Sequence, residues 1–194
     1  GINIPELEEI SGKTSTGGLN IVLFLDKKNN HFTPTKGFFN AIEIGRFDKA
    51  LGGQNDYWNF ISRNYLYLPI IYKKLFSGFK LNQESRWGDV PFYGLPFISM
   101  RGIPIMRYQD HHVTTLETEW RWQFYRRWSI IGFVGAGFTA PEIDKYRIDN
   151  NKVSGGGGFR YYLAKDFGLH VGVDVAKGPE DWAWYITIGS NWLR

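Results

Sequence analysis

Four residues close together in the chain, Ser99, Asp110, His111 and His112, are of the types that carry out nucleophilic catalysis. A serine oxygen attacks an ester or amide carbonyl when a histidine accepts its proton and an acidic residue orients the imidazole. Such a set would transfer or hydrolyse acyl groups, so an enzyme is one alternative. The spacing alone does not bring the serine within hydrogen-bonding distance of a histidine, and we expect no catalytic residues.

Two other short patterns resemble binding motifs. Gly12-Lys13-Thr14 matches the end of a phosphate-binding loop, but Leu7 stands where the motif needs an earlier glycine, and no helical pattern follows. The adjacent His111 and His112 point to opposite faces of a strand and cannot readily share one metal ion. We therefore expect a polar loop, surface histidines, no metal and no cofactor.

The composition is unusual in its aromatic share. Phe, Trp and Tyr make up 18% of the 194 residues, with 23 Gly, no Cys and a net charge of +4. The absence of Cys excludes a disulfide framework and suits export through an oxidising periplasm. The mild charge does not imply nucleic acid as a partner. The first residues lack the basic and apolar segments of a signal peptide, so an exported protein would be in its mature or trimmed form.

The elements that must position these residues are strands rather than helices. No window approaches eighteen consecutive apolar residues, as a membrane helix would require, whereas apolar residues recur at every second position over most of the chain. In the clearest case one face is aromatic and aliphatic and the other is charged. The first face carries Leu116, Thr118, Trp120, Trp122 and Phe124, and the second carries Glu117, Glu119, Arg121 and Gln123.

Two all-β architectures compete for this pattern. In a soluble sandwich the apolar face would form the core; in a membrane barrel it would meet lipid, with aromatic girdles at both interfaces. The alternating runs are long, and short joints such as Arg126-Arg127 alternate with long segments such as residues 89–110. Strands of this length with short turns on one side and long loops on the other are typical of outer-membrane barrels.

We therefore predict a transmembrane antiparallel up-and-down β-barrel of about eight strands over residues 18–194, after a polar segment at residues 1–17. Nine runs are candidates, beginning with Gly18 to Leu25, and Pro69 is expected to end the third. The inner face should carry Glu43, Lys80, Asn82, Glu84, Glu117, Glu119, Arg121, Arg160 and Asp174. The lipid face should carry Ile42, Ile44, Phe79, Leu81, Leu116, Trp120, Trp122, Val171, Val173, Ile186 and Ile188. Trp182, Trp184 and Trp192 are placed on the lipid face of the last strand.

Four segments carry a specific resemblance. They are residues 25–37, DVPFYGLPFISMRGIP (Asp89 to Pro104), IGFVGAG (Ile131 to Gly137) and GGGFRYYL (Gly156 to Leu163). Together they resemble the bacterial surface antigen barrel, the carboxy-terminal half of the outer-membrane insertase and translocase superfamily. The resemblance runs in order from about Gly18 to Trp192, although each segment alone is weak.

The resemblance implies a loop that folds back into the barrel through an Arg-Gly pair, here Arg101-Gly102. The usual acidic partner of that arginine is replaced by Gly135, so Glu117 or Glu119 is expected to take the guanidinium instead, because a charge in such an interior needs a partner. Arg121 and Arg160 are further candidates for loop contacts. Gly132, Gly135 and Gly137, with the glycines at 155–158, should thin the inner wall. Trp192 aligns with the family's carboxy-terminal assembly signal.

By resemblance the chain is a minimal barrel in outer-membrane biogenesis or protein transport, integral to the bacterial outer membrane with its C-terminus periplasmic. It holds half the usual barrel and none of the POTRA repeats that precede it. An interior of eight strands has room only for side chains or one small ligand, so a free conducting pore is not expected. Expected partners are outer-membrane lipids, the barrel-assembly machinery and a second copy in a possible homodimer. The alternatives are an outer-membrane lipid-modifying enzyme and a structural or adhesive barrel.

Overall fold

The computed structural model describes residues 14–192 as a single sheet of nine antiparallel strands whose spatial order follows the chain. The strands are β1 (Gly18–Asp26), β2 (Gly37–Phe47), β3 (Tyr57–Ile71), β4 (Leu75–Gly88), β5 (His112–Tyr125), β6 (Trp128–Ala140), β7 (Lys152–Ala164), β8 (Leu169–Lys177) and β9 (Trp182–Ile188). Four short 3-10 turns are η1 (Lys49–Leu51), η2 (Phe92–Gly94), η3 (Ile143–Lys145) and η4 (Ile148–Asn150). Among the described residues no helix is long and apolar enough to cross a membrane. The all-β, up-and-down expectation is confirmed.

The expected strand number of eight is wrong. The first run is a complete strand, because all nine residues of β1 pair with β2, so the sheet has nine strands. No ladder joins β1 to β9 among the described residues, and the sheet is open at these two edges. With an odd number of antiparallel strands, β1 and β9 run in the same direction.

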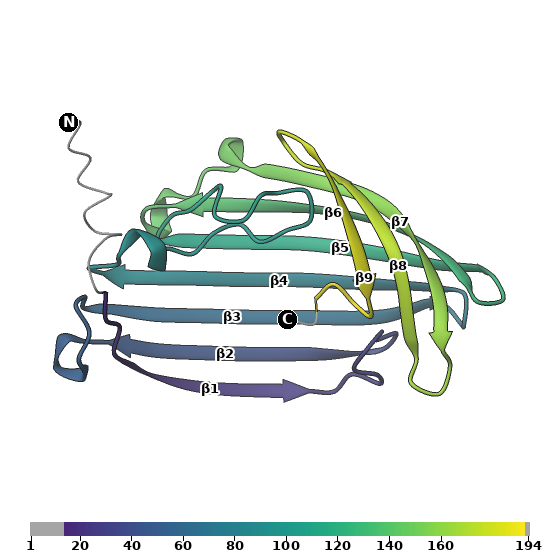
Figure 1. The fold of residues 1–194 in the computed structure, drawn as a ribbon, viewed down its shortest axis with the longest axis horizontal. Helices are drawn as coiled ribbons and strands as arrows, with labels where there is room; N and C mark the ends of the chain where they lie inside the picture. The colour runs from purple at the N-terminus through teal and green to yellow at the C-terminus, as the bar shows by residue number, and fades with distance from the viewer. Residues whose placement is uncertain (1–13, 193–194) are drawn as a thin grey trace.

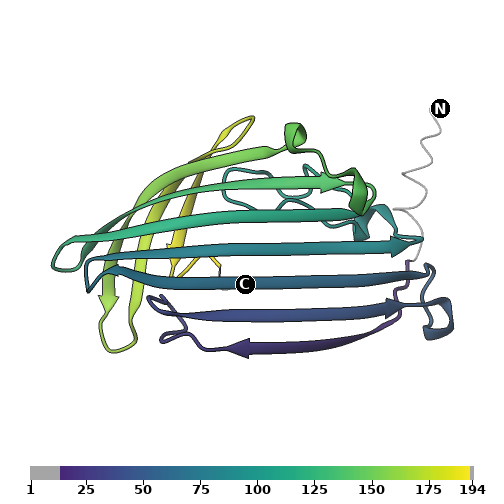
Figure 2. The same cartoon turned by 180° about the vertical axis from the view of Figure 1, so that it is seen from behind.

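The sheet curls into a trough. β1 to β6 lie side by side, whereas β7, β8 and β9 bend over the front of the sheet (Figure 1). The β4–β5 loop, residues 89–111, lies inside the trough, and the view from behind shows the uncovered convex side (Figure 2). We call the side facing the loop the inner face and the convex side the outer face.

The two ends of the sheet differ in their connections. At one end, here the turn end, the strands are joined by residues 72–74, 126–127 and 165–168, and also by residues 27–36 between β1 and β2. At the other, the loop end, the connections are residues 48–56, 89–111, 141–151 and 178–181. The expected alternation of short turns and long loops is confirmed from β2 to β8, but residues 27–36 form a longer connection at the turn end and residues 178–181 a short one at the loop end. Pro69 does not end β3, since it pairs with Phe76 and the register shifts between Pro69 and Ile71.

The assignment of side chains to two faces is confirmed by the register, because residues paired across antiparallel strands share a face. Lys80 of β4 is paired with Glu117 of β5 on the inner face. Successive backbone pairs across β5 to β8 likewise place Arg121, Ile131, Gly158 and Asp174 on the inner face. All nine residues expected inside and all eleven expected outside follow this pattern. Three of the glycines expected to thin the inner wall lie on the outer face instead, because Gly132 pairs with Trp120 and with Gly157, and Gly155 pairs with Val134.

Trp192 does not share a face with the other aromatic residues of the last strand. Trp182 and Trp184 are 65% and 73% exposed on the outer face, but β9 ends at Ile188 and Gly189, with φ of +77°, turns the chain. Trp192 is 5% exposed and packs on Tyr65 and Tyr67 of the inner face. The indole fits there because Gly78 has no side chain, and a Cβ at that position would lie 2.7 Å from the ring.

Candidate functional site

The best candidate for a functional site is the contact between the β4–β5 loop and the inner face. Arg101 is 7% exposed and its Nη2 donates to Glu119 Oε2 of β5 at 2.7 Å. Nη1 donates to Asp174 Oδ2 of β8 at 3.0 Å, and the guanidinium lies 3.5 Å from the centre of the Phe133 ring. Burial alone would lower the pKa of Arg101, but the carboxylates of Glu119, Glu117 and Asp174 outweigh it and raise the pKa above its ordinary value. Arg101 therefore stays charged.

Asp174 is the centre of this network. Its carboxylate is fully buried and accepts hydrogen bonds from Arg101 and from both terminal nitrogens of Arg160, the Nη2 bond being 2.8 Å. Thr187 Oγ1 and Asn191 Nδ2 also donate to it, at 3.3 and 3.1 Å. Because β5, β7, β8, β9 and the loop all supply groups, the carboxylate network joins the loop to the curled part of the sheet.

The backbone of the loop also contacts the β8–β9 hairpin closely. Gly102 has φ of +83°, and its N–H donates to the hydroxyl of Tyr185 at 2.8 Å. A Cβ on Gly178 would lie 1.8 Å from the Gly102 carbonyl oxygen. A side chain at position 178 would therefore push the loop away, so the Arg-Gly pair and the hairpin glycine act together.

The apolar side of the loop packs on the inner face at two glycines of β6. Ile98, Met100, Ile103 and Val113 form a buried cluster. Cβ atoms built on Gly135 and Gly137 would lie 2.9 Å from Met100 Sδ and 2.5 Å from Ile98 Cγ2 respectively. The prediction that these glycines make room for the loop is confirmed, because any side chain there would displace it.

Glu117 has a different partner from the one expected. It forms a buried ion pair with Lys80, whose Nζ also donates to the carbonyl of Ser99 at 3.3 Å, so this pair contacts the loop without Arg101. Beside it a cavity of about 330 Å³ separates the loop from β3, β4 and β5. Arg63, Asn82 and Glu84 are among the side chains that line this cavity, which makes it suitable for water or a small polar ligand.

Arg121 and Arg160 lie on the inner face but do not bind the loop directly. The Arg160 guanidinium bonds to Asp174 and to the Phe159 carbonyl. Arg121 Nη1 lies 3.1 and 3.2 Å from the two ring nitrogens of His170. Of the three arginines, only Arg101 makes the expected contact between the loop and the inner face, while Arg160 supports it through Asp174.

The residues that could have formed a hydrolytic site are not brought together. The Asp110 carboxylate accepts from the backbone N–H of His111, and among the described residues no hydrogen bond joins Ser99 Oγ to either histidine. His112 is not a surface residue as expected: it is 2% exposed and lies under the Trp87 ring, whose centre is 5.2 Å away. Within residues 14–192 no three His, Asp or Glu side chains are placed to hold a metal ion. Gly12 and Lys13 lie outside the described residues.

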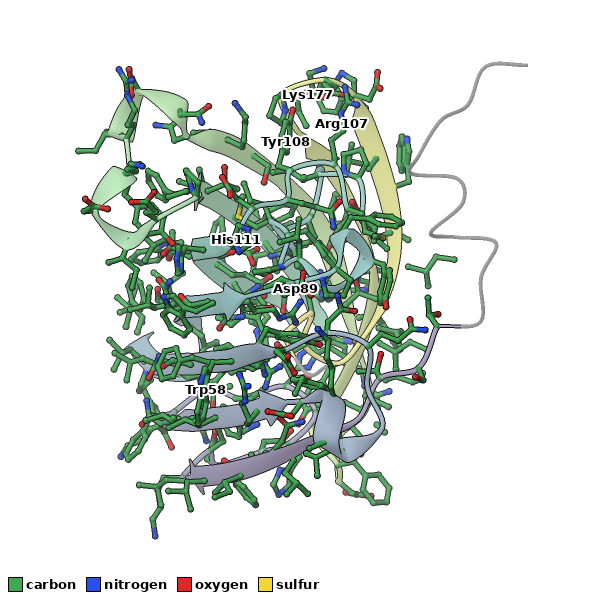
Figure 3. The ribbon with its side chains drawn as sticks, turned by 90° about the vertical axis from the view of Figure 1, so that its left-hand side faces the viewer. Trp58, Asp89, Arg107, Tyr108, His111 and Lys177 are labelled. Carbon is green, nitrogen blue, oxygen red and sulfur yellow. The ribbon has the colours of Figure 1, made fainter. Side chains whose placement is uncertain are left out.

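A second, exposed contact holds the loop at the loop end of the sheet. Arg107 Nε and the Tyr108 hydroxyl both donate to Glu180 Oε1 at 2.8 Å, and Lys177 Nζ donates to the Glu180 carbonyl at 2.7 Å. Arg107, Tyr108 and Lys177 lie close together in the view onto this end (Figure 3). Hydrogen bonds from Arg107 and then Tyr108 lower the pKa of Glu180 below its ordinary value of 4.5.

Sequence reasoning placed Asp174 on the inner face but missed its role as the partner of Arg101. One signal was available: Asp174 is the only acidic residue of β8, and it pairs with Tyr185 and Gly158. A Cβ at Gly158 would lie 2.2 Å from Asp174 Oδ1, so the glycine leaves room for the carboxylate. An isolated acid in an apolar strand opposite a glycine therefore indicates a buried ion pair.

The comparisons with known proteins give no family assignment. The sequence matches no protein-family model, and it matches no curated protein.

Proposed function

We propose that this chain forms a membrane-embedded wall of a β-barrel in the bacterial outer membrane and acts in outer-membrane biogenesis or protein transport. The observation that carries the proposal is the reversal of the usual polarity. Ile186 and Ile188 of β9 are 86% and 70% exposed on the outer face, whereas Lys80, Glu117 and Asp174 are buried on the inner face. Lipid is the solvent in which such an arrangement is favourable.

The distribution of aromatic residues on the outer face supports a membrane setting. Trp58 and Trp87 pair at the loop end, and Trp128 and Tyr161 pair at the turn end. The exposed residues between these bands are mainly aliphatic, and they include Ile42, Ile44, Leu66, Leu81, Leu116, Val134, Val153 and Val173. Two aromatic girdles separated by an aliphatic zone match the two interfaces and the core of a bilayer. β2 to β7 have 11 to 15 residues, enough to cross it when tilted.

Several polar side chains on the outer face form hydrogen bonds with one another or with a loop residue. Asn40 Nδ2 donates to Asn64 Oδ1 at 2.8 Å, across β2 and β3. The Tyr146 hydroxyl, from the β6–β7 loop, lies within hydrogen-bonding distance of Gln83 at 3.2 Å and Thr114 at 3.1 Å. Because an unsatisfied polar group in hydrocarbon costs several kcal/mol, this pairing is what a lipid-facing wall requires.

The loop and the open edge together favour a role in handling other proteins over conduction. The β4–β5 loop is fixed inside the trough by Arg101 and its two carboxylates. Among the described residues one backbone edge of β1 is unpaired, and Ile21 and Phe24, on its outer and inner faces, are both 71% exposed. An edge of this kind can add a strand from another polypeptide through main-chain hydrogen bonds. We therefore assign client contact to β1.

The membrane setting can be tested with single cysteines, because the natural chain has none. Leu81→Cys and Val134→Cys lie in the aliphatic zone, and Asp144→Cys in the exposed β6–β7 loop is the matched control. In vesicles, an environment-sensitive maleimide dye at positions 81 and 134 should be quenched by lipids brominated on their acyl chains, and the dye at 144 should not. Equal, weak quenching at all three positions would contradict the proposal.

The role of β1 needs a separate test in cells. A photo-crosslinking residue at Phe24, on the inner face of the edge strand, should capture identifiable outer-membrane proteins before they have folded. The same residue at Phe124, on the outer face of β5, is the control and should crosslink mainly to lipid. If Phe24 captures no more protein than Phe124, the edge does not contact clients even if the sheet lies in the membrane.

A further inference from the structure

One buried cation on the inner face lacks a counter-ion. The turn-end half of this face carries three guanidiniums, those of Arg101, Arg121 and Arg160, but only two carboxylates, those of Glu119 and Asp174. Arg101 binds both carboxylates and Arg160 binds Asp174, and no carboxylate of residues 14–192 lies within ion-pair distance of Arg121. Arg121 is 7% exposed, so one positive charge is buried without an ion-pair partner among the described residues.

The two side chains in contact with the Arg121 guanidinium, His170 and Phe76, supply no negative charge. Its Nη1 lies near both nitrogens of His170, and its guanidinium is 4.9 Å from the centre of the Phe76 ring. A protonated imidazole has no free lone pair and would add a second charge, so His170 must be neutral in this arrangement. Because burial of an unpaired charge is costly, a negatively charged group is expected beside the Arg121 guanidinium.

A small cavity lies directly beside Arg121. Its volume is about 30 Å³, which holds a single water or a monatomic ion but nothing larger. Arg121, Arg160 and Glu119 border it on the sheet side, with Thr33 and Trp192 opposite. Glu119 is already bound by Arg101 Nη2 at 2.7 Å, so this carboxylate is not available to Arg121 as an ion-pair partner.

Two hydrogen-bond donors around the cavity have no partner. The hydroxyl of Thr33 and the indole nitrogen of Trp192 are buried and make no hydrogen bond to the described residues, whereas the Tyr67 hydroxyl has the Ser190 side chain as a hydrogen-bond partner. Tyr67 and Trp192 are each 5% exposed. Unsatisfied buried donors are rare in folded proteins, and each one requires an explanation. Here two of them border the cavity of a guanidinium that has no ion-pair partner among the described residues.

We propose that this cavity binds one small inorganic anion of the size of chloride, held by Arg121 and by the hydroxyl and indole donors that line the cavity. A water molecule would satisfy donors but would leave the buried charge without an ion-pair partner, and a phosphate is too large for a volume of about 30 Å³. The anion joins three parts of the chain that line the cavity. They are the β1–β2 connection through Thr33, the inner face through Arg121 and the segment after β9 through Trp192. The inference concerns the inside of the sheet and holds whether or not the outer face meets lipid.

The test uses the full chain folded in detergent, with chloride replaced stepwise by gluconate at constant ionic strength. The unfolding temperature of the wild-type protein should rise with chloride and saturate, because a ligand that binds only the folded state stabilises it by mass action. Arg121→Met should remove this dependence. Arg147→Met removes the same charge from the exposed β6–β7 loop and should retain it. A wild-type unfolding temperature that is independent of chloride overturns the proposal.

A second measurement does not depend on the folding of the variant. Crystals of the wild-type protein grown in bromide should show an anomalous peak within hydrogen-bonding distance of the Arg121 guanidinium. Peaks confined to the protein surface, with the cavity empty of bromide, would mean that it holds water only and would overturn the proposal.

Discussion

Arg101 of the β4–β5 loop and Asp174 of β8 are joined by a buried hydrogen bond of 3.0 Å between charged groups. The two residues lie 73 positions apart, and their contact keeps a long loop inside a curled sheet.

Asp174→Asn should destabilise the protein by about 3–5 kcal/mol, because removing one partner of a buried ion pair leaves the others uncompensated. Here two guanidiniums, Arg101 and Arg160, lose their shared carboxylate. Urea unfolding followed by tryptophan fluorescence measures the change. Asp166→Asn, in the exposed β7–β8 turn, is the matched control and should have little effect. Equal midpoints for the two variants would show that Asp174 does not hold the network.

Arg101→Met should release the loop without unfolding the sheet. We expect hydrogen–deuterium exchange at the Gly102 and Ile103 amides to accelerate about a hundredfold, the factor that corresponds to about 3 kcal/mol. These amides donate to Tyr185 and to the Met100 carbonyl in the closed loop. Arg107→Met removes an exposed ion pair of the same loop and should change exchange far less. Similar acceleration in both variants would contradict the distinction between the buried and the exposed contact.

The contact at Glu180 should depend on pH. Its pKa is lowered in the folded protein by Arg107 and then Tyr108, so the contact is fully present above the ordinary pKa of 4.5 and is lost as the pH falls through the lowered value. Tyr108 ring signals in an NMR titration should therefore shift only below pH 4.5. Glu180→Gln should abolish this shift. A transition near neutral pH would assign the effect to another group.

The seam between the two sheet edges should be closed at one end only. At the turn end Ser190 N–H donates to the Phe32 carbonyl at 2.7 Å and Asn30 Nδ2 to the Phe167 carbonyl at 2.8 Å, whereas no ladder joins β1 to β9. A short bismaleimide should therefore link Phe32→Cys to Ser190→Cys within one chain, and not Leu19→Cys to Trp182→Cys at the loop end. Efficient linkage within one chain at both ends would show a closed seam. Linkage between chains at the loop end would support the possible homodimer.

Trp192→Ala should destabilise the purified protein by about 3–5 kcal/mol, the usual cost of removing a buried tryptophan. The ring packs on Tyr65 and Tyr67 at centroid distances of 6.1 and 5.9 Å. Trp192→Phe keeps an aromatic ring and should recover part of the loss in chemical denaturation. The assembly-signal prediction is separate, and a slower assembly in cells by a variant of normal stability would support it.

The sequence by itself determined the fold class, the two faces of the strands and the two kinds of connection. Side chains alternate between faces with a period of two, so residues such as Glu117 and Trp120 could be assigned without a structure. Short joints such as Arg126-Arg127 can only connect neighbouring antiparallel strands, which specifies the neighbouring strands at these joints.

Only the tertiary structure decided the strand number, the open edges and the partners of the inner charges. Whether β1 pairs with β9 depends on the curvature of the whole sheet, which no local pattern records. Trp192 turns inward because Gly189 takes a left-handed conformation and Gly78, far away in the chain, leaves space for the ring. Arg101 binds Asp174 rather than Glu117 because the curl of β7, β8 and β9 over the trough brings β8 to the loop, while Lys80 on the neighbouring strand already pairs with Glu117. Contacts between distant segments depend on where the chain lies in space, and alternation along a strand carries no such information.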